Sequence, residues 1–179
     1  MIAPFPTDQV FIGGQWRAPV GGQTLAIENP STGEALGTLA AGGTADIDAA
    51  VQAARTALDG PWGRMTAVER GRILARMSRE VEARIDLLAE LEALDVGKPL
   101  KQARNDVVAL ARYLEFYAGA ADKLHGETIP FQDGYTVYTL REPHGVTGHI
   151  IPWNYPMQII GRSVVAALCV GNAVVLKPA

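Results

Sequence analysis

Two short apolar runs separated by one helical segment constrain the fold of this chain more than any other feature. The runs are Val146 to Ile151 and Ala173 to Lys177, and the segment between them, Met157 to Val170, has apolar residues at helical spacing. This order and these lengths predict a β-α-β unit. Because such crossovers join parallel strands, we expect the beginning of a parallel sheet in an α/β fold.

The carboxyl end of this sheet is a candidate ligand site. Parallel strands place their carboxyl ends at one edge, and open α/β sheets bind ligands there. Trp153 and Asn154 follow the first run, and Lys177 ends the second, so these side chains are expected to share one rim. The turn after the first run contains no glycine, so a G-x-G-x-x-G pyrophosphate loop is absent from this unit.

The front of the chain is predicted to be a small β layer. Gly13-Gly14 is a strong hairpin signal because both residues adopt positive φ easily, and Asn29 to Gly33 has the composition of a turn. The strands expected around these turns are Val10 to Ile12, Gln15 to Arg17, Leu25 to Glu28 and Ala35 to Ala40.

Three helices are predicted next. The first has an apolar face and ends at Gly60-Pro61, and its face comprises Ile47, Val51, Ala54 and Leu58. The second starts with a capping box formed by Thr66 and Glu69. Its apolar residues keep helical spacing through Leu88, which predicts one long helix that ends at Gly97. The third, which includes Val107, Leu110, Leu114 and Tyr117, is expected to close at Gly119. Tyr135 to Arg141 then alternates like a strand outside the β-α-β unit.

Composition excludes several classes of function. With 16 Lys plus Arg against 19 Asp plus Glu the formal charge is −3, and no basic run favours nucleic acid or anionic membranes. The longest apolar stretch, Val164 to Leu176, is shorter than the roughly 20 residues that span a bilayer. A single Cys and the absence of a secretory signal favour the cytoplasm. We therefore expect a soluble cytoplasmic protein.

A series of motifs from about Val10 onward resembles the amino-terminal portion of the aldehyde dehydrogenase superfamily. The matching segments, in the family's order, are Phe11 to Trp16, Asn29 to Glu34, Asp95 to Pro99, Phe116 to Gly119, Pro152 to Pro156, Gly171-Asn172 and Lys177-Pro178. The resemblance implies an α/β fold with a small β layer, long helices and the first β-α-β of a Rossmann-like parallel sheet. The implied boundaries are 1–134 for the amino-terminal part of the cofactor-binding domain, 135–142 for a strand of the oligomerisation arm and 143–179 for the β-α-β unit.

The resemblance implies oxidation of an aldehyde to a carboxylic acid with NAD or NADP, through a Cys thiohemiacetal. Family members are much longer, and their nucleophilic Cys and general-base Glu have no counterpart in these 179 residues. The chain alone is therefore expected to be inactive, and the full-length form to be a homodimer or homotetramer. An inactive truncated fragment and a relative that forms acyl-CoA are alternatives. The aldehyde and the choice between NAD and NADP stay open.

Asn154 is the candidate catalytic residue. Its carboxamide offers two donors and does not titrate, and a donor aimed at an oxygen that gains negative charge stabilises it by about 3 kcal/mol. The family places an Asn in this oxyanion role. Alternatively, Asn154 caps the helix that begins near Tyr155-Pro156; both roles are compatible.

The candidate cofactor-binding residues are Ile150, Ile151, Pro152, Trp153 and Lys177. The resemblance implies that Lys177 contacts the adenosine ribose and that the other four line the cleft, mostly through backbone and apolar surface. The alternatives are a solvated charge for Lys177 and burial of the two isoleucine side chains in the strand.

The remaining reactive residue types are expected to be structural. Cys169 lies in an apolar helix without a neighbouring cation, which is typical of a buried core residue and not of a nucleophile. His125, His144 and His149 have no Cys or second His at ligand or triad spacing. No metal site is predicted.

Overall fold

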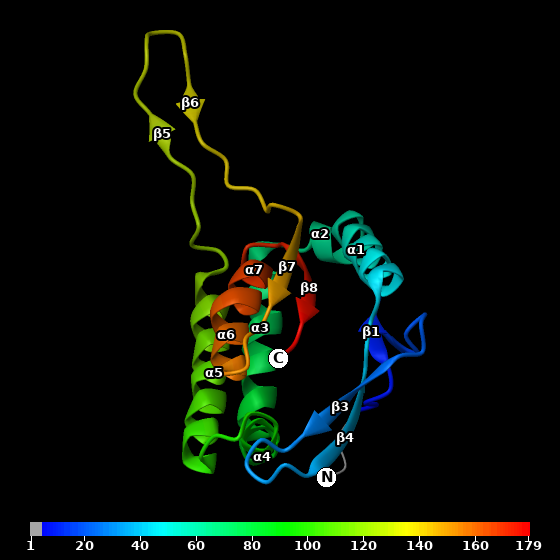
Figure 1. Cartoon of the computed structure of the whole chain (residues 1–179). Coiled ribbons are helices and arrows are strands. Elements are labelled where there is room, and N and C mark those ends of the chain that lie inside the picture. The colour runs from blue at the N-terminus through cyan, green and yellow to red at the C-terminus, as the bar shows by residue number, and fades with distance from the viewer. Residues whose placement is uncertain (1–4) are drawn as a thin grey trace.

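Three helices form the body of the molecule in the computed structural model, which describes residues 5–179 (Figure 1). They are α3 (Ala67–Glu82), α4 (Ile85–Val96) and α5 (Leu100–Ala120). Helix α5 packs against both α3 and α4. The main core comprises Leu74, Leu110, Leu114, Ala121, Val165 and Cys169. Because the last two belong to the crossover between the parallel strands, this core also anchors that crossover to the body.

The prediction of one long helix from Thr66 to Gly97 is wrong in one respect, because the helix breaks at Ala83 and Arg84. Arg84 has φ −123° and ψ 22°, outside the helical region. The break lets α4 turn, so that Ala89 packs with Ala103 and Val107 of α5. A straight continuation of 12 residues would instead extend about 18 Å beyond the end of α3.

The predicted helix ends are largely confirmed. The Thr66 side chain accepts a hydrogen bond from Glu69 N, and Glu69 bonds back to Thr66 N at 2.8 Å, which is the expected capping box. Gly97 ends α4 in the left-handed region with φ 70°. Helix α5 ends at Ala120, one residue beyond Gly119, within the usual uncertainty of helix boundaries.

The predicted β layer is confirmed as two antiparallel hairpins. Their strands are β1 (Val10–Ile12), β2 (Gln15–Arg17), β3 (Thr24–Glu28) and β4 (Ala35–Ala40). Gly13 and Gly14 have φ 62° and 80°, as a two-residue hairpin turn with two positive φ values requires. Figure 1 shows the strands β3 and β4 on one side of the carboxyl end of the chain and the helices α3 and α5 on the other.

Helix α1 (Thr44–Asp59) and the short α2 (Pro61–Arg64) connect the β layer to the body. The expected apolar face of α1 is only partly correct, because Ile47 is 49% exposed whereas Asp46 is buried. The Asp46 carboxylate accepts hydrogen bonds from the backbone N–H groups of Val20 and Gly43. The first turn of α1 is therefore oriented by these backbone donors, and Ile47 is left uncovered.

The β-α-β unit is present with the predicted parallel pairing. Strand β7 (Val146–Ile150) pairs with β8 (Ala173–Lys177), from Val146 opposite Ala173 to Ile150 opposite Lys177. The crossover consists of α6 (Pro156–Ile159), a π-helical stretch η1 (Ile160–Val165) and α7 (Ala166–Cys169). The π-helical stretch was not predicted. Within it, Gly161 lies against α5, where a Cβ would come within 2.6 Å of the Tyr113 ring.

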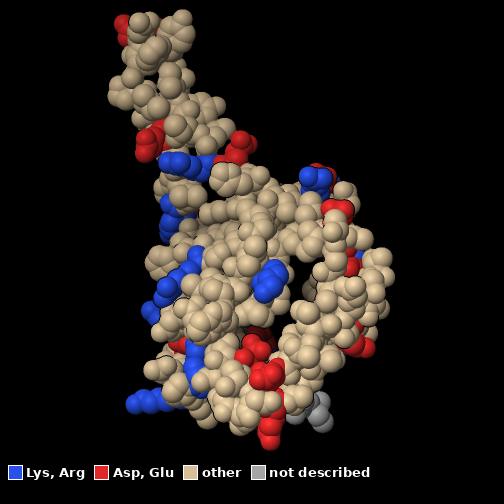
Figure 2. Space-filling model, viewed as in Figure 1, with Lys and Arg blue, Asp and Glu red and all other residues tan. Residues whose placement is uncertain are grey.

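A hairpin projects away from the body between α5 and β7 (Figure 1). Strand β5 (Thr128–Ile129) pairs with β6 (Val137–Tyr138), so the strand predicted over Tyr135 to Arg141 is much shorter than expected. No other described strand flanks this hairpin, so its pairing is not extended by neighbours. We call residues 126–140 the arm. Figure 2 shows few charged side chains on its visible face, and Glu127 and Asp133 are the charged residues of this segment.

Candidate functional site at the carboxyl edge of the parallel strands

The ends of β7 and β8 form one rim, as predicted. Ile150 lies opposite Lys177 in the parallel register. One residue further, the Ile151 backbone N–H donates to the Lys177 carbonyl oxygen at 3.0 Å. The segment from Pro152 to Tyr155 leaves the sheet at this point and leads into α6. The backbone therefore brings the candidate cofactor-binding residues and Asn154 to the same edge of the sheet.

Asn154 is exposed, and its carboxamide makes no hydrogen bond within residues 5–179. The N-cap of α6 is Tyr155, and no side chain caps this helix. The structure therefore does not support the alternative helix-cap role of Asn154. Asn172 provides a contrast, because it is buried and its carboxamide accepts from Gly145 N at 3.0 Å and donates to Ala167 O at 3.2 Å. The Asn172 carboxamide therefore links two segments of the fold, whereas the Asn154 carboxamide has no partner among the described residues.

Apolar residues follow one another at the end of β7, at the edge that Lys177 shares. Ile150 is 81% exposed and Trp153 is 72% exposed, while Ile151 is buried. The expected burial of Ile150 is therefore wrong. Successive side chains of a strand alternate between faces, and His149 contacts Ser163 of η1, so Ile150 faces away from the crossover helix. Ile150 therefore presents apolar surface at the end of β7, on the face opposite the crossover helix.

Cys169 is a core residue, as predicted. Its thiol is buried and donates to the Tyr117 carbonyl oxygen at 3.2 Å. Burial raises the pKa of the Cys169 thiol, and the charge of Arg70 only partly opposes this effect. A thiol with a raised pKa is a poor nucleophile at neutral pH.

The histidines are dispersed. His149 makes local contacts, with Nε2 at 2.9 Å from Thr147 Oγ1 and Nδ1 against Ser163 Oγ, and burial lowers its pKa. His125 and His144 are exposed. Within residues 5–179, no three side chains of the His, Cys, Asp and Glu types gather where they could hold a metal ion.

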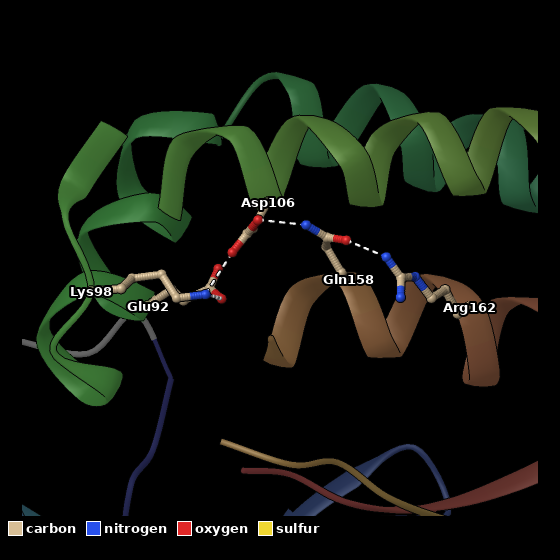
Figure 3. Close-up of polar contacts among 5 residues, drawn as sticks. All are labelled: Glu92, Lys98, Asp106, Gln158 and Arg162. Carbon is tan, nitrogen blue, oxygen red and sulfur yellow. Dashed lines mark hydrogen bonds and ion pairs between the residues drawn. The ribbon is translucent and has the colours of Figure 1, made fainter. Parts of the chain in front are cut away.

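A buried cluster of charges beside the rim was missed by the sequence reasoning. Lys98 Nζ lies 2.9 Å from Glu92 Oε1 and 2.5 Å from Asp106 Oδ2. The other carboxylate oxygen of Asp106 accepts from Gln158 Nε2 of α6 at 2.6 Å (Figure 3). A signal for this cluster exists in the sequence, because Asp106 occupies a core-facing position of α5, between Ala103 and Leu110.

Burial and pairing act in opposite directions in this cluster. Burial raises the pKa of Glu92, although the nearby Lys98 ammonium partly offsets the effect. Burial lowers the pKa of Lys98, but its hydrogen bonds and charge interactions with Asp106 and Glu92 outweigh burial, so the pKa of Lys98 is raised. Glu92 Oε2 is buried and has no hydrogen-bond partner among the described residues. The ammonium is therefore the charge that holds the cluster together.

No helix in the described part of the chain combines the length and the apolarity needed to cross a membrane.

Known proteins similar to this chain have the same fold. Over 173 residues, the chain is 46% identical to the Arabidopsis thaliana protein named aldehyde dehydrogenase family 2 member B4, mitochondrial, covering 96% of this chain and 32% of that protein. The crystal structure of a Burkholderia cenocepacia protein assigned to the aldehyde dehydrogenases is 63% identical, with a TM-score of 0.93, over 94% of this chain and 36% of the other.

An NAD+ complex of an aldehyde dehydrogenase from Bacillus cereus is 40% identical, also with a TM-score of 0.93, over 97% of this chain and 36% of the other. The chain thus spans about a third of the length of these relatives. These structures confirm the predicted α/β fold of the family's amino-terminal part. A sequence model of the Aldehyde dehydrogenase family matches residues 16–179, and the chain belongs to this family.

Proposed function

We propose that this chain provides the oxyanion donor and one edge of the cofactor site of an NAD(P)-dependent aldehyde dehydrogenase, which oxidises an aldehyde to a carboxylic acid. The observation that carries the proposal is the exposed Asn154 carboxamide, free of hydrogen bonds within residues 5–179, at the sheet edge shared with Lys177. Open α/β sheets bind their ligands at this edge.

Asn154 acts on the aldehyde oxygen. When a thiolate adds to an aldehyde, negative charge develops on the former carbonyl oxygen, and an amide N–H directed at that oxygen stabilises it. An amide donor keeps its protons across the physiological pH range. Loss of one such donor in other enzymes reduces kcat by about 100- to 1000-fold, and this is the contribution proposed for Asn154.

The rim residues fit a nicotinamide cofactor, which accepts a hydride when bound. Ile150, Pro152 and Trp153 offer exposed apolar surface, while buried Ile151 contributes through its backbone. Lys177 is exposed at the same edge, where its ammonium is able to donate to ribose hydroxyl groups. The Bacillus cereus relative forms a complex with NAD+, and the proposal for this chain includes NADP equally.

The nucleophile is proposed to come from outside the 179 residues. Cys169 is the only cysteine, and it is buried with a raised pKa. We expect the isolated chain to form no NADH from an aldehyde. Aldehyde-dependent NADH formation by the purified chain would contradict this expectation.

The arm is proposed to contact another subunit in a homodimer or homotetramer. It carries exposed large apolar side chains and little charge, and these side chains are Ile129, Phe131, Tyr135, Tyr138 and Leu140. A hairpin with such a surface is a candidate interface. The proposed units remain 1–134, 135–142 and 143–179, and residues 135–140 of the second belong to the arm. The cytoplasmic location stays a prediction from the sequence.

The experiment joins residues 1–179 to the downstream two thirds of the Burkholderia cenocepacia relative. We expect this chimera to reduce NAD+ or NADP+ with an aldehyde. Asn154→Ala is expected to lower kcat by about 100- to 1000-fold while cofactor binding is unchanged. Asn105→Ala, an exposed Asn on α5, is the matched control and is expected to keep full activity.

Two further measurements separate the parts of the proposal. Lys177→Met is expected to raise the KM for the cofactor about tenfold, because a hydrogen bond to a charged donor is worth about 1.5 kcal/mol or more. Adding coenzyme A distinguishes a relative that forms acyl-CoA, since only that relative produces a thioester of coenzyme A. Full kcat in Asn154→Ala would refute the oxyanion role.

A further inference from the structure

The ion cluster beside the rim contains three charged side chains that are almost completely buried. The side chains of Glu92, Lys98 and Asp106 are 0%, 10% and 4% exposed. Burying such charges costs desolvation energy, and buried ion pairs are weak sources of net stability. In some proteins, buried ion pairs instead fix the conformation of neighbouring segments. The contacts of this cluster show which segment it fixes.

The cluster holds the first turn of α6 at two points. Lys98 Nζ lies 4.6 Å from the centroid of the Tyr155 ring, a distance at which a cation and an aromatic face attract each other. Asp106 Oδ1 accepts a hydrogen bond from Gln158 Nε2 at 2.6 Å (Figure 3). Tyr155 is the N-cap of α6 and Gln158 is its third residue. Both points therefore depend on the same ammonium, directly at Tyr155 and through Asp106 at Gln158.

Asn154 lies immediately before this turn and has no side-chain bond of its own within residues 5–179. Its backbone is fixed on one side by the hydrogen bond between Ile151 N and Lys177 O. On the other side, its nearest fixed points are Tyr155, Met157, which packs against both core clusters, and Gln158. The direction of the Asn154 carboxamide therefore depends on how firmly these contacts hold the first turn of α6 in place.

The loop that carries Lys98 is itself closely packed. Gly97 has φ 70°, and a Cβ at this position would come within 2.8 Å of Pro30 Cγ and 3.3 Å of Ser31 Oγ. The turn between β3 and β4 therefore lies directly against the corner between α4 and α5. The β layer therefore contacts the residue before Lys98, while the helical body and α6 meet at the ion cluster.

We propose that Lys98 is a positioning residue, which holds Tyr155 directly and Gln158 through Asp106, and thereby fixes the direction of the Asn154 carboxamide. The catalytic consequence rests on the proposed function, whereas the effect on the order of residues 153–158 does not. A displacement of about 1 Å at a catalytic group can cost about 100-fold in rate. The ion cluster does not act on the reacting atoms directly. It positions the Asn154 carboxamide, which is the group proposed to contact them.

The first test is backbone amide NMR relaxation of the 179-residue chain. Order parameters for Trp153, Asn154, Tyr155 and Gln158 are expected near 0.85 in the unsubstituted chain and below about 0.6 in Lys98→Met. Lys123→Met removes a lysine from an exposed pair with Asp122 and is expected to change none of them. Lys98→Arg keeps a cation at the cluster and is expected to restore most of the order. Unchanged order in folded Lys98→Met overturns the proposal.

A second variant covers the case in which Lys98→Met unfolds, since it leaves two buried carboxylates unpaired. Gln158→Met removes the bond to Asp106 and also the bond that Gln158 Oε1 accepts from Arg162. It leaves both ion pairs of Lys98 intact, and Arg162→Met, which removes the second bond but keeps the first, is the control that separates the two. We expect Gln158→Met to lower the order of the same residues to an intermediate degree. If Gln158→Met leaves their order unchanged, the link through Asp106 is refuted.

The second test uses the chimera with the Burkholderia cenocepacia relative. Lys98→Met and Gln158→Met are expected to lower kcat, by about 100-fold and about 10-fold, with the KM for the cofactor unchanged. A variant that merely loses stability lowers the amount of active enzyme and is recognised by its unfolding curve. An inactive unsubstituted chimera counts against the proposed function, while the relaxation experiment still decides the positioning role. Full kcat together with a disordered turn overturns the proposal.

Discussion

The helical body and the arm contain apolar side chains of similar exposure, but their backbones differ in support. Phe116 of α5 is 66% exposed and Phe131 of the arm is 64% exposed. Phe116 belongs to a 21-residue helix that packs against α3 and α4. Phe131 lies between two strands of two residues each. Side-chain exposure alone therefore does not report local stability, which depends on what the backbone is bonded to and packed against.

The two regions also differ in how much of their apolar surface they bury by their own packing. The body buries Leu74, Leu114 and Val107 almost completely. All the large apolar side chains of the arm are exposed or half-exposed, and an isolated hairpin is at best marginally stable in water. Within the described residues, the large apolar side chains of the arm are left mostly uncovered, which fits the subunit contact proposed above.

The largest expected difference is in proteolysis. Chymotrypsin is expected to cleave the native chain after Phe131 or Tyr135 at least about 100-fold faster than after Phe116, because local opening of the arm costs almost nothing and opening of α5 costs a large part of the unfolding free energy. Mass spectrometry of timed digests provides the measurement. In denaturing urea the difference should vanish. First cleavage after Phe116 would reverse the assignment of stable and unstable regions.

A core substitution should sharpen the contrast. Leu114→Ala removes a fully buried side chain and is expected to lower the free energy of unfolding by about 2–5 kcal/mol. Leu140→Ala makes the same change in the arm, where the side chain is exposed, and is expected to cost less than about 0.5 kcal/mol. Urea unfolding followed by circular dichroism measures both. Equal losses would mean that the arm contributes to the core.

Helix capping should give a smaller effect of the same kind. Thr66→Ala removes the capping box of α3 and is expected to cost about 1 kcal/mol. Thr136→Ala in the arm alters an exposed Thr and is expected to be nearly neutral. Both are measured by urea unfolding at the same pH. A neutral Thr66→Ala would indicate that the start of α3 is held by packing and not by its cap.

The smallest expected effect is the pH dependence contributed by Glu92. Burial raises the pKa of Glu92 in the folded chain above its ordinary value of 4.5, so the folded state holds this proton more tightly than the unfolded state. The stability that Glu92 contributes is therefore present below pH 4.5 and is lost as the pH rises through the raised pKa. Glu92→Gln does not titrate, so the stability of the unsubstituted chain relative to Glu92→Gln should fall as the pH rises.

Urea unfolding of both proteins between pH 4.5 and 7.5 measures this difference. A relative stability that increases with pH would mean that the pairing of Glu92 with Lys98 outweighs its burial.

Local features of the fold were predicted from the sequence because they depend on short-range chemistry. The turn at Gly13-Gly14 requires positive φ, the capping box needs only Thr66 and Glu69, and Gly97 ends a helix in the left-handed region. The strand bounds Val10–Ile12 and Ala173–Lys177 follow from apolar runs and flanking turns. The resemblance of seven motifs indicated the family, which the family match confirms.

The amino-acid sequence by itself determined the local elements, the parallel β-α-β unit and the placement of Asn154 and Lys177 at one edge. The tertiary structure decided the break at Arg84, the π-helical turn against Tyr113, the exposure of Ile150 and the meeting of Lys98 with Tyr155. The physical reason is range: a cap or a turn is a property of a few neighbouring residues, whereas burial, helix breaks and ion pairs depend on which distant surface the folded chain places opposite them.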